Sequence, residues 1–200
     1  MKRALIICSF FLLLGTNSVA QKEFFKNTSV SFLVHQGSSL PEYSFVNYLT
    51  NDYLHAFTLD FTKRTTGKND WERLYKYPEV GISLFYTSLG NKDVLGNAFA
   101  LNYFFRVHFI STKKWKVYNQ TGIGLGYLTK IFDLVENYKN VGIGSHFNAH
   151  FSFRFGTSYA LTEKFEAKLG LSFDHFSNGN TADPNLGLNN LSVFAGLTSA

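Results

Sequence analysis

A histidine and a serine stand two residues apart at His175 and Ser177, near the end of a segment with strand-like alternation. Residues two apart on a β-strand point to the same side of the sheet, so the imidazole and the hydroxyl would come close to hydrogen-bond distance. A histidine so placed can remove the proton of a serine hydroxyl and make it a nucleophile. The pair therefore predicts ester hydrolysis. The alternative is that both residues belong to a loop beside the Asn, Gly and Pro-rich stretch that follows.

The segment that precedes this pair indicates the face of the strand on which it lies. The odd positions are apolar and the even positions are largely polar, with Phe165, Ala167, Leu169, Leu171 and Phe173 opposed to Lys164, Glu166, Lys168, Ser172 and Asp174. His175 and Ser177 continue the apolar row, whereas Asp174 should point to the opposite face. The pair would then sit at the end of a lipid-facing row, where the ester of a membrane lipid is presented.

Two other groups of residues could carry chemistry. Glycines alternate within residues 121–127, but a phosphate-binding loop needs a helix N-terminus after it and no helix pattern follows. We interpret these glycines as positions inside a narrow barrel that has no room for side chains. His146, Asn148 and His150 are candidate metal ligands on one strand face, but no acidic or cysteine partner accompanies them. A polar network with Arg154 inside the barrel is the favoured interpretation.

Alternation of apolar and polar residues dominates the chain and predicts β-strands. It is clearest at residues 95–109 and 143–155, where apolar odd positions oppose Asn, Arg, His and Ser at even positions. Six noisier segments bring the number of predicted strands to eight, at 28–36, 52–63, 79–89, 95–109, 115–129, 143–155, 163–177 and 190–200. Turn-forming residues separate these segments, and no helical periodicity competes with them.

The length and composition of these strands favour a membrane barrel. Several span 13 or more residues, whereas globular strands have about 5–6 and a tilted membrane strand needs about 9–11. The chain has 22 Phe and 11 Tyr but only 16% charged residues, and no apolar stretch after residue 20 is long enough for a membrane helix. We predict an all-β fold, an eight-stranded antiparallel transmembrane β-barrel of the outer membrane with an apolar outer face and a polar lumen. A secreted β-sandwich or lipocalin-like barrel is the alternative.

The first twenty residues have the order of a secretory signal, with a basic start (1–3), an apolar run (4–14) and small residues up to a cleavage site after Ala20. The apolar run is shorter than the roughly 20 residues that a membrane helix needs. We expect a single barrel domain over residues 21–200. Removal of the signal takes two of the 19 basic side chains and leaves 17 against 14 acidic ones, a net charge of +3. That excess is too small to indicate nucleic-acid binding.

Around the histidine and serine the chain resembles the PagL-type lipid A 3-O-deacylases, eight-stranded outer-membrane barrels that hydrolyse one acyl ester of lipopolysaccharide. The resemblance rests on His175-Phe176-Ser177-Asn178, on Pro184-Asn185 at the family's distance, and on Gly187. It implies that Ser177 is the nucleophile and His175 the general base. It also implies that the Asn185 amide helps to stabilise the oxyanion of the tetrahedral intermediate. No cofactor or metal is implied, because the serine and the histidine supply the nucleophile and the base.

One position departs from the family pattern, because Asn189 stands where an acidic residue would orient the histidine. An Asn carbonyl can accept the ring N–H, as it does in Cys-His-Asn hydrolases, but it stabilises the imidazolium less than a carboxylate would. Slow turnover, help from another acid and loss of activity are the alternatives that this departure leaves open. Asp174 is an unlikely substitute because it should face the other side of the sheet.

The resemblance also implies lipid A or lipopolysaccharide as the substrate and membrane lipids as the surroundings. We expect Lys113, Lys114 and Lys130 to meet the substrate's phosphates. A homodimer is left open, as are a non-catalytic barrel with a structural or adhesive role and a soluble barrel that carries a small ligand. The chain stops at Ala200 without the aromatic strand end that is common in outer-membrane barrels, so a truncated form is a further alternative.

Overall fold

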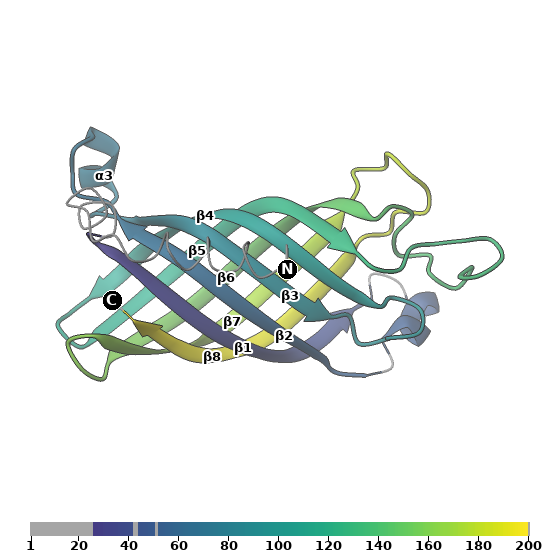
Figure 1. Cartoon of the computed structure of the whole chain (residues 1–200), viewed down its shortest axis with the longest axis horizontal. Helices are drawn as coiled ribbons and strands as arrows, with labels where there is room; N and C mark the ends of the chain where they lie inside the picture. The colour runs from purple at the N-terminus through teal and green to yellow at the C-terminus, as the bar shows by residue number, and fades with distance from the viewer. Residues whose placement is uncertain (1–25, 42–43, 51, 200) are drawn as a thin grey trace, which may run out of the picture.

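The computed structural model describes residues 26–41, 44–50 and 52–199, so the predicted signal segment lies outside the described residues. It contains eight strands, β1 (Thr28–Leu40), β2 (Leu54–Arg64), β3 (Glu79–Ser88), β4 (Asn97–Ser111), β5 (Trp115–Leu128), β6 (Phe147–Ala160), β7 (Phe165–Ser177) and β8 (Leu188–Ser199). Each strand pairs antiparallel with its neighbours, and β1 pairs with β8 to close the barrel (Figure 1). Closure leaves no strand edge exposed for association with other chains.

The predicted all-β barrel and its eight strands are confirmed, with bounds that shift by a few residues. The sixth strand begins at Phe147 rather than at 143, and Ile143 is buried among apolar side chains instead of facing outward. Two short helices were not anticipated, the 3-10 helix η1 (Ser44–Leu49) and the α-helix α3 (Asp70–Leu74). Segments of this length are too short to give a helical periodicity in the sequence. No helix among the described residues is long and apolar enough to cross a membrane.

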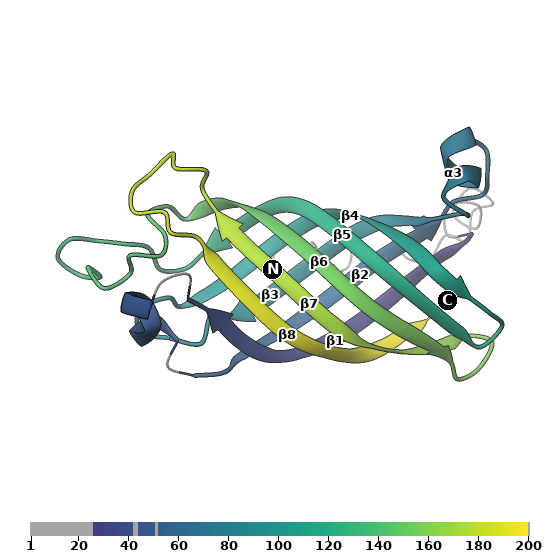
Figure 2. The ribbon, with the colours of Figure 1, turned by 180° about the vertical axis from the view of Figure 1, so that it is seen from behind.

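The two ends of the barrel differ in the length of their connections. Residues 41–53, 89–96, 129–146 and 178–187 connect strands at one end, which we call the loop end. The other end, which we call the turn end, has the connections 65–78, 112–114 and 161–164. Figures 1 and 2 show the long loops together at one end and α3 at the other. Strand β7 therefore ends, and β8 begins, at the loop end.

The outer face of the barrel is apolar, as predicted. All eight strands expose large apolar side chains, among them Phe32, Val34, Phe57, Phe61, Ile82, Leu84, Phe99, Leu101, Tyr103, Ile123, Leu125, Phe151, Phe153, Phe155, Leu169, Leu171, Phe173, Leu191, Val193 and Leu197. Such a continuous belt would be insoluble in water but matches the hydrocarbon region of a bilayer. The alternation seen in the sequence is thus the alternation between lipid and lumen.

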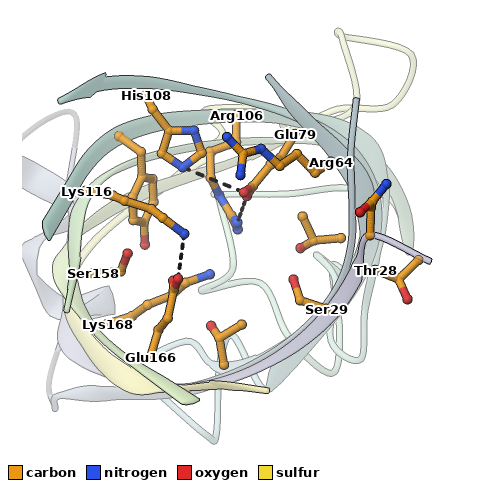
Figure 3. Close-up of a pocket in the computed structure, with 14 residues that line it drawn as sticks. Thr28, Ser29, Arg64, Glu79, Arg106, His108, Lys116, Ser158, Glu166 and Lys168 are labelled. Carbon is orange, nitrogen blue, oxygen red and sulfur yellow. Dashed lines mark hydrogen bonds and ion pairs between the residues drawn. The ribbon is translucent and has the colours of Figure 1, made fainter. Parts of the chain in front are cut away.

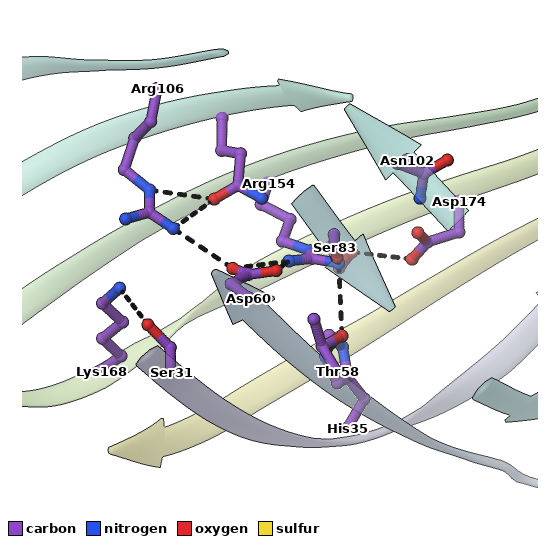
Figure 4. A network of polar contacts seen from close by, with 12 residues as sticks. Ser31, His35, Thr58, Asp60, Ser83, Asn102, Arg106, Arg154, Lys168 and Asp174 are labelled. Carbon is purple, nitrogen blue, oxygen red and sulfur yellow. Dashed lines mark hydrogen bonds and ion pairs between the residues drawn. The ribbon is translucent and has the colours of Figure 1, made fainter. Parts of the chain in front are cut away.

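Charged side chains fill the middle of the barrel. Asp60 on β2 bridges two buried arginines, at 3.2 Å from Arg106 Nη2 and 3.2 Å from Arg154 Nη1. Arg106 also binds Glu79 Oε2 at 2.7 Å and Gln120 Oε1, so its guanidinium is held from three strands. Figure 4 shows Arg106 and Arg154 on either side of Asp60. These charges are buried yet paired, which offsets the cost of removing them from water.

The interior near the loop end is apolar, which corrects the prediction of a wholly polar lumen. The buried cluster comprises Val46, Leu49, Leu54, Ala56, Phe85, Leu89, Leu95, Ala98, Ala100, Leu128, Ile143, Phe176 and Leu188. Several of these residues stand at inward positions of strands, and others come from the loops and from η1. The loops and strand ends therefore share one small core, which anchors the loop end.

Alternating glycines on β5 allow large side chains to cross the lumen. A Cβ atom at Gly126 would lie 2.7 Å from the Phe176 ring, and one at Gly122 would lie 2.5 Å from Ser152 Oγ. A side chain at Gly126 would displace the Phe176 ring, whereas one at Gly122 would require the Ser152 hydroxyl to turn away. The interpretation of these glycines as lumen positions is confirmed.

The connection 65–78 at the turn end is organised around one carboxylate. Glu72 Oε2 accepts hydrogen bonds from the backbone N–H groups of residues 66–68 at 3.1, 2.6 and 3.0 Å, and Oε1 accepts one from Asn69 Nδ2 at 2.7 Å. Desolvation raises the pKa of Glu72, but the hydrogen bonds outweigh it and hold the pKa below its usual value. The ionised carboxylate is therefore the form that keeps this connection ordered.

We expect this connection to loosen in acid. Because the pKa of Glu72 is lowered in the folded protein, its contribution is fully present above the usual value of 4.5 and is lost as the pH falls through the lowered pKa. Amide protection factors of residues 66–68, measured by hydrogen exchange, should fall in that range. Glu72→Gln should show low protection already at neutral pH, while Glu163→Gln, which removes an exposed carboxylate from another turn at the same end, should behave as the parent. Equal protection in parent and Glu72→Gln would contradict the assignment.

Candidate active site

Strand β7 carries His175 and Ser177 on its outward face, at the loop end. The outward row runs from Leu169 through Phe173 to these two residues, while Asp174 and Phe176 point inward and are buried. Ser177 is the last residue of β7. The prediction that both residues continue the lipid-facing row is confirmed, and the alternative that both are loop residues is wrong.

The register of the sheet places Asn189 beside His175. The two residues are direct partners between β7 and β8, and His175 Nδ1 lies 2.6 Å from Asn189 Oδ1. With the ring N–H at Nδ1 donating to the amide carbonyl, Nε2 is left as the basic nitrogen. The predicted geometry of Asn189 as a partner of the histidine ring is therefore present.

Gly187 lets the 178–187 loop close over the histidine. Its φ angle is +75°, and a Cβ atom at this position would lie 3.0 Å from His175 Cε1. Any other residue would be strained at this φ angle, and its Cβ atom would press against the imidazole ring of His175. The backbone N–H of Gly187 donates to Gly142 O at 3.0 Å, which ties the 178–187 loop to the neighbouring 129–146 loop.

Ser177 is held by the 178–187 loop rather than by the imidazole. Asn185 Nδ2 donates to Ser177 Oγ at 3.0 Å, and the backbone N–H of Gly179 donates to the same oxygen at 3.2 Å. Asn185 is itself fixed, because its Oδ1 accepts the backbone N–H of Asn178 at 3.1 Å. In the described part of the chain no hydrogen bond joins His175 to Ser177. Two N–H donors thus converge on the hydroxyl, which places them next to the oxygen of any carbonyl group that Ser177 attacks.

The contribution of Gly179 could not be found by sequence reasoning. Its donor is a backbone group, and only the folded loop decides where that group points. The one available signal is the glycine itself, since a glycine shortly after a strand marks a sharp turn, and its φ angle is +63°.

The outer surface beside the pair is apolar and has one small residue. Phe151 on β6 faces His175, with ring centroids 6.4 Å apart. Ala149, the register partner of Ser177, is the small residue in the outward row between Phe147 and Phe151. A hydrocarbon chain lying along the barrel here would contact aromatic side chains while its ester lies at the level of the hydroxyl.

The lysines predicted to meet phosphates lie at opposite ends of the barrel. Lys130 follows β5 at the loop end, and its Nζ donates to Asp93 O at 2.6 Å. Lys113 and Lys114 lie in the β4–β5 connection at the turn end. Strand β5 has 14 residues, so roughly 40 Å separates these two lysines from the loop end. Their predicted role at the site of Ser177 is therefore wrong, because connections of an antiparallel barrel alternate between its ends and the one after β4 lies opposite the one after β7.

The inward side of the same strands carries a separate polar group. Asp174 Oδ1 lies 3.3 Å from His150 Nε2, and Asp174 Oδ2 accepts the Ser172 hydroxyl at 2.7 Å. Asp174 therefore faces away from His175, as predicted. His150 lies in the lumen with Arg154, as expected, although the two have different hydrogen-bond partners.

The candidate metal ligands are not brought together. His146 precedes β6 and its Nδ1 lies 2.6 Å from Leu128 O, whereas Asn148 contacts Ser145 and His150 contacts Asn102. The described residues contain no group of three or more His, Cys, Asp or Glu side chains that could hold a metal ion.

Similarity to known proteins extends over most of the chain. A family model described as lipid A 3-O-deacylase (PagL) matches residues 55–198. The crystal structure of Neisserial surface protein A (NspA) is similar with a TM-score of 0.59 and 12% identity, covering 86% of this chain and 96% of that chain. The crystal structure of the outer membrane enzyme PagL is similar with a TM-score of 0.55 and 15% identity, covering 84% of this chain and 97% of that chain. At these identities the two structures show a common fold, and a search of curated proteins gave no match.

Proposed function

This chain belongs to the lipid A 3-O-deacylase (PagL) family, and from that premise we propose that it hydrolyses the 3-O-linked acyl ester of lipid A with Ser177 as the nucleophile and His175 as the general base. The observation that carries the proposal is the convergence of four groups at one point of the outer rim. Ser177, His175, Asn185 and Asn189 come from β7, β8 and the loop between them, and each has a contact suited to one task of acyl transfer.

The reaction would proceed through an acyl-enzyme. Ser177 Oγ attacks the ester carbonyl while His175 Nε2 takes the hydroxyl proton, and the intermediate collapses as His175 returns that proton to the departing sugar oxygen. Water then attacks the acyl-serine with His175 again as the base, which releases the fatty acid and restores the hydroxyl. Substrate binding has to bring Nε2 and Oγ into contact, as is common for hydrolases whose catalytic hydrogen bonds tighten only in the complex.

Asn185 and Gly179 would stabilise the oxyanion. Their N–H groups already point to Ser177 Oγ, at 3.0 and 3.2 Å. The carbonyl oxygen of a bound ester would lie next to this hydroxyl and gain negative charge in the tetrahedral intermediate. In the tetrahedral intermediate this oxygen and Oγ are bonded to the same carbon, so both donors have to turn from Oγ to the neighbouring oxyanion, a short movement because the loop already holds them beside it.

The site's place on the barrel supports lipid A as the substrate and the outer membrane as the location. Ser177 lies where the apolar outer face ends at the loop end, so an ester at the boundary between head group and hydrocarbon would reach it from within the bilayer. Lipopolysaccharide occupies the outer leaflet, so the loop end would face outward. Mass spectrometry of lipid A incubated with the purified barrel tests the proposal, with loss of one 3-O-linked fatty acid as the expected product.

A non-catalytic surface barrel is the second candidate. It is favoured by the absence of a carboxylate beside His175 among the described residues and by the likeness of the fold to Neisserial surface protein A. The two candidates differ in one result, because the surface barrel would leave lipid A intact under every condition.

Substitutions of Asn189 test how the histidine is oriented. Asn189→Ala removes one hydrogen bond to a ring that becomes charged, so we expect kcat/KM to fall about 10- to 100-fold without loss of the reaction. Asn189→Asp keeps the oxygen near Nδ1 and adds a negative charge that favours the protonated ring. Its rate should rise at high pH, and the acidic limb of its pH–rate profile should move to higher pH. Identical profiles for parent and both variants would show that Asn189 has no part in catalysis.

A further inference from the structure

A cavity at the turn end, far from Ser177, is not used by the proposed reaction. It has a volume of about 300 Å³, and all eight strands contribute to its wall. The view in Figure 3 shows charged side chains and hydroxyl groups pointing into it from every side. A polar cavity of this size can hold a small ion or a head group together with water.

Basic groups outnumber acidic groups in the cavity wall. Its two carboxylates are already engaged, since Arg106 Nη1 binds Glu79 Oε2 at 2.7 Å and Lys116 Nζ binds Glu166 Oε1 at 2.5 Å. Three further basic residues line the wall, namely His108, whose Nε2 lies 3.8 Å from Glu79 Oε1, and Arg64 and Lys168, for which the described residues show no ion pair. The cavity therefore carries an excess of positive charge.

Lys168 is the least compensated of these basic groups. It is 5% exposed, its Nζ donates to Ser31 Oγ at 2.9 Å, and it lies 5.7 Å from the centroid of the Tyr118 ring. No carboxylate within the described residues forms an ion pair with it, and the nearby Asp60 already bridges two guanidinium groups. A buried ammonium without a direct ion pair is costly, so an anion in the cavity would stabilise it.

Thr62 gives a second, independent indication. Its side chain is 3% exposed and lines the same cavity, and Oγ1 has no hydrogen-bond partner among the described residues. Buried hydroxyls are nearly always paired, so an unpaired one that faces a cavity is available to a ligand. The exposed guanidinium of Arg64 adds a donor to the same wall.

We propose that this cavity binds a phosphate-type oxyanion, with Lys168 and Thr62 as its inner contacts and Arg64 as its outer one. A tetrahedral oxyanion presents several acceptor oxygens and a negative charge, which match an ammonium, a hydroxyl and a guanidinium converging from different strands. The same chemistry is offered by free phosphate and by a phospholipid head group in the leaflet at the turn end.

The first test uses the full mature protein in phospholipid-free detergent. Sodium phosphate is compared with sodium chloride at equal ionic strength, and the thermal unfolding midpoint and the heat of titration are measured. We expect phosphate to raise the midpoint, Lys168→Met to weaken the apparent affinity at least ten-fold, and Thr62→Val to weaken it several-fold. Lys168→Met removes a buried charge without orphaning a partner carboxylate, so it should fold. Lys164→Met, which alters an exposed lysine in a turn at the same end, is the matched control and should bind as the parent does.

The second test separates the two sources of the anion. The protein is reconstituted in galactolipid vesicles with or without phosphatidic acid, and unfolding midpoints of parent and Lys168→Met are compared. A response to inorganic phosphate identifies the free ion, and a response to phosphatidic acid alone identifies the head group. The site is overturned if the parent responds to neither, or if Lys168→Met responds as the parent does. Ser177→Ala should retain the response, which keeps this test independent of the proposed hydrolysis.

Discussion

Ser177→Ala is expected to abolish the release of fatty acid from lipid A while the barrel stays folded. The hydroxyl is the proposed nucleophile, and loss of the nucleophile in a serine hydrolase costs on the order of 10⁶ in kcat, so we expect a decrease of at least about 10³-fold. Among the described residues the side chain bonds only to Asn185 and to Gly179 of the adjoining loop, so the strand pairing does not depend on it. Mass spectrometry of the lipid product gives the rate, and a heat-modifiability gel reports folding.

Two further variants sharpen that result. Ser38→Ala alters another partly buried, outward-facing serine near the loop end, on β1, and should keep the parental rate. His175→Asn should be almost as damaging as Ser177→Ala, because without a base the hydroxyl remains a poor nucleophile at neutral pH. If Ser177→Ala deacylates lipid A as fast as the parent, the assignment of the nucleophile is wrong. If no variant or parent releases fatty acid, the surface-barrel candidate is favoured.

Asp60→Asn should cause the largest loss of stability among single substitutions in the lumen. The side chain keeps its size but loses the charge that lies 3.2 Å from both Arg106 and Arg154. Breaking a buried ion pair while its partner stays behind costs about 3–5 kcal/mol, and here two guanidinium groups lose their shared partner. Urea unfolding in phospholipid vesicles, followed by tryptophan fluorescence, measures the change.

A matched charge change and a double variant separate this effect from net charge. Asp93→Asn removes a carboxylate from an exposed position at the loop end and should change the free energy of unfolding by less than about 0.5 kcal/mol. Adding Arg154→Met to Asp60→Asn should recover part of the loss, since one orphaned charge is removed. An Asp60→Asn barrel as stable as the Asp93→Asn barrel would show that the bridge contributes nothing to stability.

Period-two alternation was sufficient to predict the number of strands and the direction in which their side chains point. The pattern is local and depends only on which residues neighbour one another along the chain, so it can be recognised without knowing which strands pair. It placed His175 and Ser177 on the lipid-facing row and Asp174 on the lumen side, as the structure has them. The glycines of β5 were found in the same way, because glycine at every second position marks one face of a strand.

Tertiary structure alone decided which distant residues meet. The contact of His175 with Asn189 could be anticipated from a motif, but its 2.6 Å geometry depends on the register between β7 and β8. Whether the backbone N–H of Gly179 points to Ser177 depends on the path of the 178–187 loop. Lys113 and Lys114 lie at the end opposite Ser177 because successive connections of an antiparallel barrel alternate between its ends, which follows from the order of the strands and not from the alternation within one strand.

Tertiary structure also decided which side chains fill each part of the lumen. Inward positions are largely polar in the sequence, yet inward Phe85 and Phe176 join loop residues such as Ile143 in an apolar core at the loop end. At the turn end, Lys168 on β7 and Thr62 on β2 line one cavity only because the sheet closes into a barrel. Local periodicity determines the face on which a side chain lies. Closure of the sheet determines what lies opposite it, because the partners across a lumen are set by register and strand order and not by spacing along the chain.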